Sequence, residues 1–234
     1  MSKILVYSEE AAVLQELLGK ARQAVEAGAF DQVETAVFGA AVAAQYGAWG
    51  ADVVYTVQAP ELQSYHPETY TDALAGLIRE AQPDLVLVGA TKRGLEVSGR
   101  VAERLNLGAA SWCTDFSRDP QTGAITVECM IYTGVGKNTY RINSRPALAT
   151  VAPGTFRARP DNYSETCQVV NLTVPINAPV LQVLENNEKT AEAGRRLQDA
   201  PVIVDVGQGV RQRGDLGLAQ ELADLLNGQV SCSR

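Results

Sequence analysis

Residues 85–115, LVLVGATKRGLEVSGRVAERLNLGAASWCTD, contain the pattern that decides the fold. The first four, 85–88, are all apolar, which is typical of a strand buried on both faces of a parallel sheet. Apolar residues then recur every four positions over residues 94–106 and predict a helix with one face against the sheet. Residues 110–116 follow as a second strand. The stretch is therefore predicted to be one strand–helix–strand unit.

The residues before this unit repeat the same alternation of strands and helices. Strands are predicted at 3–7, 33–38 and 53–55, and helices at 9–27, 39–46 and 67–82. Strands that alternate with helices of about 10–15 residues indicate a parallel sheet with right-handed crossovers. The predicted fold class is therefore α/β, with a mainly parallel, Rossmann-like sheet that carries helices on both faces.

The pattern changes after residue 116, where strand-forming segments are separated by short turns. Strands are predicted at 125–132, 139–143 and 147–151, with turns at 119–123 and 134–138. An edge strand or cross-domain strand is predicted at 166–173, and a short strand at 180–184. These segments add a hairpin-like section to the α/β pattern.

The sequence indicates two domains joined by a linker. Residues 1–187 are predicted to form the α/β domain, and the charged, non-periodic segment 188–200 is predicted to be the linker. Residues 201–234 are predicted to contain a strand, a glycine turn, a helix and the start of another strand, as at the beginning of a second α/β domain. A segment of this length rarely buries a core of its own, so the second domain is predicted to be incomplete.

The composition is that of an ordinary globular protein and argues against several classes of partner. The chain has 46% hydrophobic and 20% charged residues, a net charge of -7 and a pI near 4.9. An acidic chain is a poor partner for the phosphates of nucleic acid and for anionic membranes. No apolar run approaches the roughly 20 residues of a membrane span, and strand-like sequence begins at Lys3, which leaves no room for a signal peptide. We therefore expect a cytoplasmic protein that neither binds nucleic acid nor inserts into a membrane.

The sequence offers no recognisable catalytic or metal-binding set. The four cysteines are far apart and form no C-x-x-C pair, so no zinc or iron–sulfur site is predicted, and reduced, mostly buried thiols are expected. The single histidine, His66, argues against most histidine-based catalysis and is predicted to lie in a surface loop. Thr114 and Asp115 are predicted to bond the backbone at a strand end. Neither catalytic nor metal-ligating residues are therefore assigned.

Several of these segments resemble the α subunit of electron transfer flavoproteins. In that family a strand leads into a Gly-Ala-Thr-x-Arg-Gly-like turn, a helix and a Cys-Thr-Asp-like end, here residues 89–94 and 113–115. A later strand of the family has the pattern Pro-x-x-x-Thr-x-x-Pro-Gly, here residues 146–154, whereas Thr133 replaces the middle glycine of a Tyr-Gly-Gly-like turn. The resemblance covers the whole chain. It implies the first domain of such a subunit, followed by the start of its FAD-binding domain.

The glycine turn at 207–209 is the candidate cofactor loop. By itself it is half of a dinucleotide fingerprint, because Gln212 stands where the third glycine would be, and the residues alone favour a glycine turn without a ligand. The resemblance changes this interpretation, since in the family the arginine of a Gly-Arg-Gly turn and a Ser-Arg pair contact FAD. It implies that Gln208, Ser233 and Arg234 are the cofactor-binding residues, with Gln208 in place of the arginine.

The resemblance also implies an electron carrier rather than an enzyme that converts a substrate. Together with a β subunit, such a protein passes electrons through FAD from a dehydrogenase to an acceptor. The alternative is an adenine-nucleotide-binding module of the universal-stress type without redox chemistry, although its usual glycine-rich phosphate loop is missing. Residues 91–93 leave two interpretations open: an anion site on exposed N–H groups, or a capped, solvated helix start, which the residues favour.

Overall fold

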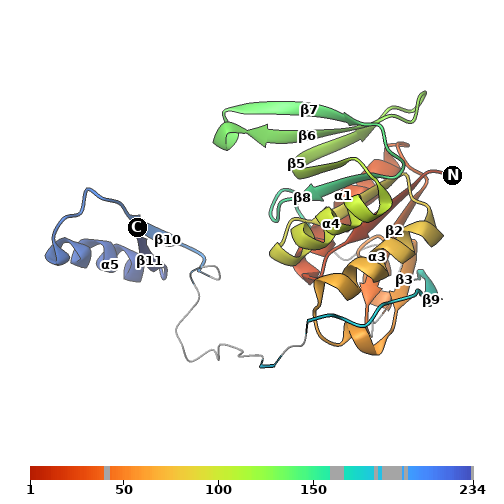
Figure 1. Ribbon diagram of the computed structural model, residues 1–234. Coiled ribbons are helices and arrows are strands. Elements are labelled where there is room, and N and C mark those ends of the chain that lie inside the picture. Colours follow the sequence, from red (N-terminus) through yellow and green to blue (C-terminus); the bar gives the residue numbers. More distant parts are fainter. Residues whose placement is uncertain (40–42, 159–165, 182–183, 186–196, 198–199, 233–234) are drawn as a thin grey trace. The chain divides into compact units, whose positions relative to one another are not determined.

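The computed structural model describes residues 1–39, 43–158, 166–181, 184–185, 197 and 200–232. The chain divides into two compact units, Met1–Gln182 and Val183–Arg234, which are both drawn in Figure 1. The predicted linker, residues 188–200, lies outside the described residues apart from Leu197 and Ala200.

The first unit is built on a nine-stranded sheet with the order β7-β6-β5-β8-β4-β1-β2-β3-β9. The strands are β1 (Lys3–Tyr7), β2 (Gln32–Phe38), β3 (Val53–Val57), β4 (Leu85–Gly89), β5 (Ala109–Arg118), β6 (Ile125–Ile131), β7 (Gly136–Ile142), β8 (Ala147–Val151) and β9 (Gln168–Leu172). The pairs β5–β6 and β6–β7 are antiparallel, and the other neighbours are parallel. The prediction of a mainly parallel sheet is confirmed, and β9 is the predicted edge strand.

Helices cover both faces of this sheet (Figure 1). They are α1 (Ala11–Glu26), α2 (Ala43–Ala48), α3 (Pro67–Ala81) and α4 (Lys92–Leu105), with short 3-10 helices η1 (Pro60–Leu62) and η2 (Tyr132–Gly134). The alternation of side chains along β4 shows the two faces. Leu85 and Leu87 pack in the core that includes α1, whereas Val86 and Val88 pack in the core that includes α3 and α4.

The strand–helix unit at the start of the deciding stretch forms as predicted. Each residue of β4 is buried, and β4 lies in the middle of the sheet between β8 and β1. Helix α4 begins at Lys92, two residues earlier than predicted, because the Thr91 hydroxyl oxygen accepts the Gly94 N–H at 2.9 Å and caps the first turn. Asn106 ends the helix with a left-handed φ of 52°.

Strand β5 is longer than predicted because it serves two neighbours. Its first half pairs in parallel with β8, and its second half pairs antiparallel with β6. The change of partner coincides with register shifts near Cys113 and with a left-handed φ of 56° at Trp112. The parallel core and the β6–β7 hairpin are therefore joined through one irregular strand.

The structure corrects three local predictions. His66 lies in the loop before α3 but is 8% exposed, so it is buried and not at the surface as predicted; its carbonyl oxygen accepts the Tyr70 N–H. Val180 and Leu181 form a bend and Leu184 has no regular structure, so the described part of 180–184 is not a strand; its exposed side chains have no sheet to pack against.

The hairpin turn is shorter than the predicted 134–138. Tyr132 and Gly134 adopt positive φ angles within η2, which lets the chain reverse early and places Gly136 at the start of β7. The predicted start of the second helix, at Gly39, lies next to residues outside the described part of the chain, and α2 is described from Ala43.

The second unit contains a parallel pair of strands, β10 (Ile203–Val206) and β11 (Gln229–Cys232), with helix α5 (Leu216–Leu225) between them, preceded by a 3-10 turn at Arg213–Asp215. The predicted first strand and helix of a second α/β element are therefore present. Of the described apolar side chains in this unit, Val206 and Ala223 are buried, whereas Leu218 and Leu225 are more than 70% exposed. The unit buries little apolar surface of its own.

A buried carboxylate lies at the amino end of the first unit's sheet. Glu34 on β2 is 1% exposed, with the Lys3 Nζ at 3.2 Å and the Tyr55 hydroxyl donating to it at 3.1 Å. Burial raises the pKa of Glu34, and the neighbouring Lys3 ammonium offsets this only in part. Burial and the Glu34 charge together raise the pKa of Tyr55 to about 12.

Glu34 should make the folded state less stable as the pH rises. A carboxyl whose pKa is higher in the folded than in the unfolded chain holds its proton more tightly when folded, so its contribution is present at low pH and is lost as the pH rises through the folded pKa. Glu34→Gln removes this group. The free energy of unfolding in urea should be measured for the unmodified chain and the variant from pH 4 to 7. As the pH increases, the stability of the variant should rise relative to that of the unmodified chain. A difference that stays constant or falls with pH would contradict the raised pKa of Glu34.

Candidate functional site

The candidate cofactor turn follows β10 at the carboxyl end of the second unit's strands. Gln208 is exposed between Gly207 and Gly209, and the turn is closed by the Val210 N–H, which donates to the Gly207 carbonyl at 3.2 Å. A Cβ built on either glycine would meet nothing within 4 Å, so the backbone of the turn is open to an approaching ligand. This is the edge at which α/β folds bind ligands.

The register of the strand pair connects this turn with the end of the chain. Val206 pairs with Cys232, so β10 and β11 end at the same edge of their sheet. Ser233 and Arg234, the other two predicted site residues, directly follow β11 in the sequence but lie outside the described residues. The structure therefore describes Gln208 and does not test whether it lies near the other two.

The backbone of the described turn is suited to an FAD pyrophosphate, but the turn lacks the positive charge that would complement it. An anionic group at such a turn is held by backbone N–H groups and by a guanidinium. The turn offers exposed glycine backbone and the neutral Gln208 amide. The nearest described carboxylate along the strand, Asp205, accepts the Ser231 hydroxyl. The described residues thus supply one loop of a flavin site.

A second site lies at the carboxyl edge of the first unit. A cavity of about 300 Å³ opens there between the ends of β1 and β2, and Tyr7, Glu9, Phe38, Tyr70 and Arg93 are among its lining residues. The strand order reverses between β1 and β4, so the cavity lies beside the usual ligand crevice of open α/β sheets. Sequence analysis missed Glu9, although its position directly after the first buried strand was a usable signal.

Glu9 gives this cavity its polarity. The Thr91 hydroxyl donates to Glu9 Oε1, while Glu9 Oε2 is buried and has no hydrogen-bond partner among the described residues. Burial, and secondly the Glu9 charge, raise the pKa of the Tyr7 phenol far above its ordinary value. The Arg93 guanidinium stacks over the Tyr65 ring, 4.6 Å from its centroid. The cavity therefore offers an acceptor among aromatic side chains, without a nucleophile–base pair in its described lining.

The same contacts decide between the two interpretations of residues 91–93. Thr91 is 6% exposed and uses its hydroxyl for the helix cap and for Glu9, and Arg93 is stacked on Tyr65. The structure therefore supports a capped helix start, in which Thr91 is buried and Lys92 and Arg93 are exposed to solvent as expected.

The expectation of mostly buried thiols holds for two of the four cysteines, since Cys167 is half-buried and Cys232 is exposed. All four are thiols, and Cys113 and Cys129 are buried. These two face each other across β5 and β6, with their Sγ atoms 3.3 Å apart. Burial raises the pKa of the Cys113 thiol well above its usual range, which keeps it protonated and unreactive. Within the described residues, no group of three potential ligands forms a metal site.

Comparison with known families assigns both units. The model of the electron transfer flavoprotein domain matches residues 4–177, and that of the electron transfer flavoprotein FAD-binding domain matches residues 196–234. The chain belongs to the electron transfer flavoprotein family. The resemblance inferred from individual motifs is thereby confirmed, and membership favours an electron carrier over a universal-stress nucleotide module. The second match also supports FAD as the cofactor of this family.

Individual relatives agree with the family models. The chain is 30% identical over 188 residues to an electron transfer flavoprotein subunit alpha of Thermoanaerobacterium thermosaccharolyticum. The aligned region covers 80% of this chain and 57% of the relative. It is 34% identical over 169 residues to a putative electron transfer flavoprotein subunit, YdiR, of Escherichia coli, and this alignment covers 71% of this chain and 53% of the relative. A FixB protein of Azotobacter vinelandii is 28% identical over 228 residues, and this alignment covers 94% of this chain and 63% of the relative. The chain thus spans between half and two thirds of these relatives.

Membrane insertion finds no support in the described helices. None of them is long and apolar enough to cross a bilayer.

Thr91 should stabilise the wall of the carboxyl-edge cavity in this electron transfer flavoprotein chain, because it holds Glu9 and caps α4. Thr91→Ala removes both the cap on α4 and the hydrogen bond to Glu9, and should lower the free energy of unfolding by about 1–2 kcal/mol. Urea unfolding monitored by circular dichroism measures this loss. Thr91→Ser keeps the hydroxyl and should stay close to the unmodified chain; an equal loss in both variants would show that the methyl group, not the hydroxyl, matters.

Proposed function

We propose that this chain is part of the α subunit of an electron transfer flavoprotein, which with a β subunit carries electrons through FAD from a dehydrogenase to an acceptor. The observation that carries the proposal is that two models of this family match the chain in succession and together cover almost all of it. Because the chain spans only part of its relatives, the activity of the whole protein is inferred from the family. An electron carrier needs no catalytic set of its own, in keeping with the sequence.

The two units take different parts in this proposal. Residues 1–187 form the scaffold domain and provide the interface for the β subunit, residues 188–200 form the linker, and residues 201–234 begin the FAD domain. The division of the chain near residue 182 and the gap between the two family matches, 177 to 196, support such a boundary. We place the protein in the cytoplasm because its four cysteines are far apart in the sequence and are expected to be reduced.

Three residues of this chain are proposed to hold the flavin: Gln208, Ser233 and Arg234. FAD supplies the redox chemistry when it is bound. A guanidinium at Arg234 beside the flavin ring would favour the reduced, anionic form and so raise the reduction potential. Gln208 can donate its amide N–H groups to an anionic group but brings no positive charge. A charge-assisted hydrogen bond contributes about 1.5–3 kcal/mol, so this position should bind FAD less tightly than an arginine would.

The 234-residue chain alone should bind FAD weakly or not at all. Its second unit buries little apolar surface, so the flavin ring would remain in water, where the remaining contacts are weak. Titration of FAD into the chain, followed by quenching of flavin fluorescence, tests this expectation. Tight stoichiometric binding would place the site elsewhere in the chain.

A longer chain with a complete FAD domain should bind the flavin, and an arginine at the turn should increase its affinity for FAD. In that chain Gln208→Arg should strengthen FAD binding about tenfold, and Arg234→Ala should lower the reduction potential. Gln212→Arg adds the same charge to another exposed residue of the same loop and is the matched control. If both arginines strengthen binding equally, the gain comes from general charge and Gln208 does not contact the flavin.

The chain should form a stable heterodimer with a homologous β chain. The scaffold domain is proposed to provide the β-subunit interface, so co-expression and size-exclusion chromatography should yield a one-to-one complex. A chain that elutes as a monomer in the presence of its β partner would contradict the proposed assembly.

A further inference from the structure

A cavity of about 660 Å³ lies at the amino ends of β4 and β8, opposite the edge that carries the usual ligand crevice. Helices α3 and α4 both end beside it. Its apolar lining residues, called the apolar floor below, are Ile78, Pro83, Leu105, Leu107 and Pro146. A cavity of this volume with an apolar floor is the size of a small-molecule site.

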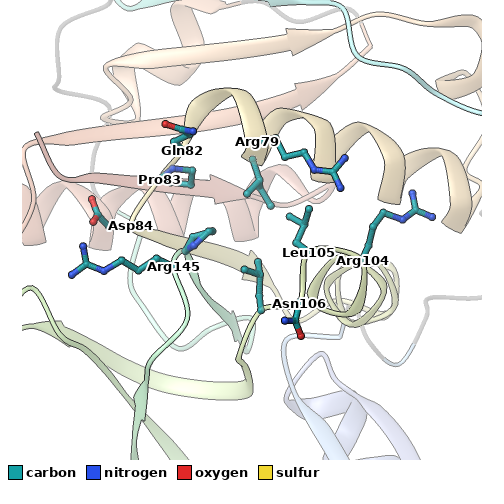
Figure 2. Close-up of a pocket in the computed structure, with 11 residues that line it drawn as sticks. Arg79, Gln82, Pro83, Asp84, Arg104, Leu105, Asn106 and Arg145 are labelled. Atoms are coloured by element: carbon teal, nitrogen blue, oxygen red, sulfur yellow. The ribbon is translucent and has the colours of Figure 1, made fainter.

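Arginines from three different elements line this cavity. Arg79 comes from the last turn of α3, Arg104 from the last turn of α4, and Arg145 from the loop between β7 and β8. In Figure 2, Arg79 and Arg104 extend to one side, whereas Arg145 lies on the other side together with Asp84. Positive charge therefore borders the apolar floor at two separate places.

Two of these guanidinium groups have no partner among the residues that the structure describes. Neither Arg79 nor Arg145 forms a hydrogen bond or an ion pair within the part of the chain that the structure describes. Arg104 is paired with Asp72, a buried carboxylate that also accepts the backbone N–H of Asn177 at 3.0 Å. Among the described lining residues Asp84 is the one carboxylate, and its Oδ2 already accepts the Lys3 N–H at 3.0 Å.

The helix dipoles explain only part of this arrangement. Basic residues in the last turn of a helix interact favourably with its carbonyl end, which accounts for the positions of Arg79 and Arg104. Arg145 belongs to no helix. An adjoining cavity of about 140 Å³ shares Asp84 and Arg145 and adds Arg141, so further positive charge converges on this edge although the chain as a whole carries a net charge of -7.

We propose that this arginine cavity, defined by Arg79, Arg104 and Arg145, binds a small organic anion with at least two negative charges on either side of an apolar body. The planar guanidinium forks fit carboxylate and phosphate oxygens in pairs, and the apolar floor holds the body of the ligand out of water. The site is separate from the flavin turn, and it stands whether or not the chain carries electrons.

Calorimetric titration of the full 234-residue chain tests this site with three aromatic probes. Terephthalate carries a carboxylate at each end of its ring, hydroquinone bisphosphate carries a phosphate at each end, and benzoate is the singly charged control. All titrations use the same ionic strength, set with sodium chloride. At least one of the two doubly substituted probes should bind saturably at one site, more tightly than benzoate and more weakly as salt is added. Which of them binds better distinguishes carboxylate from phosphate ligands.

Variants locate the binding in the arginine cavity. Arg145→Gln and Arg79→Gln should each weaken binding about tenfold or more. Arg100→Gln is the matched control, because Arg100 lies on α4 outside the cavity and pairs with Glu96. Asp84→Asn removes the negative charge beside Arg145 and should strengthen binding, which tests the site even if an arginine variant folds poorly. Absence of saturable binding by both terephthalate and hydroquinone bisphosphate, or equal affinity in all variants, would overturn the proposal.

Discussion

The burial of β4 on both of its faces is the constraint on which the first unit depends. Leu85 and Leu87 require a cover on one side of the sheet, and Val86 and Val88 require one on the other. Helix α1 supplies the first cover, and α3 and α4 supply the second. Because parallel neighbours must be joined by crossovers, the helices that cover β4 are also those that connect the strands. The same arrangement places the ends of these helices beside the amino and carboxyl ends of the strands, where the two cavities described above lie.

Sequence reasoning succeeded where structure is decided locally. Unbroken apolarity identified β4, and four-residue spacing identified α4, while Asn106 carries the left-handed angle that its side chain tolerates. It failed where structure depends on distant segments. His66 is buried although it lies in a loop, and the described part of the apolar run near Val180 forms no strand. A polar residue in a loop and an apolar run give no local sign of such outcomes.

The candidate sites divide in the same way. A glycine turn after a strand can be read from the sequence, and the family match supports its relation to FAD. The arginine cavity is invisible in the sequence, since Arg79, Arg104 and Arg145 are separated by 25 and 41 residues and line one cavity only because α3 packs against α4 and α4 packs against β8. Glu9 is intermediate, because its position after β1 is local but its bond to Thr91 spans 82 residues.

The double pairing of β5 has a consequence for how the protein can change over time. In the order of the sheet, β6 and β7 lie beyond β5, so their strand pairing to the remaining sheet runs through the second half of that strand. The irregularity near Trp112 separates this half from the half that pairs with β8. A change in the length of the hairpin therefore leaves the register of the parallel strands unaltered. Because Ile125, Val127 and Cys129 of β6 belong to the core, the tip of the hairpin at η2 is the part that evolution can reshape.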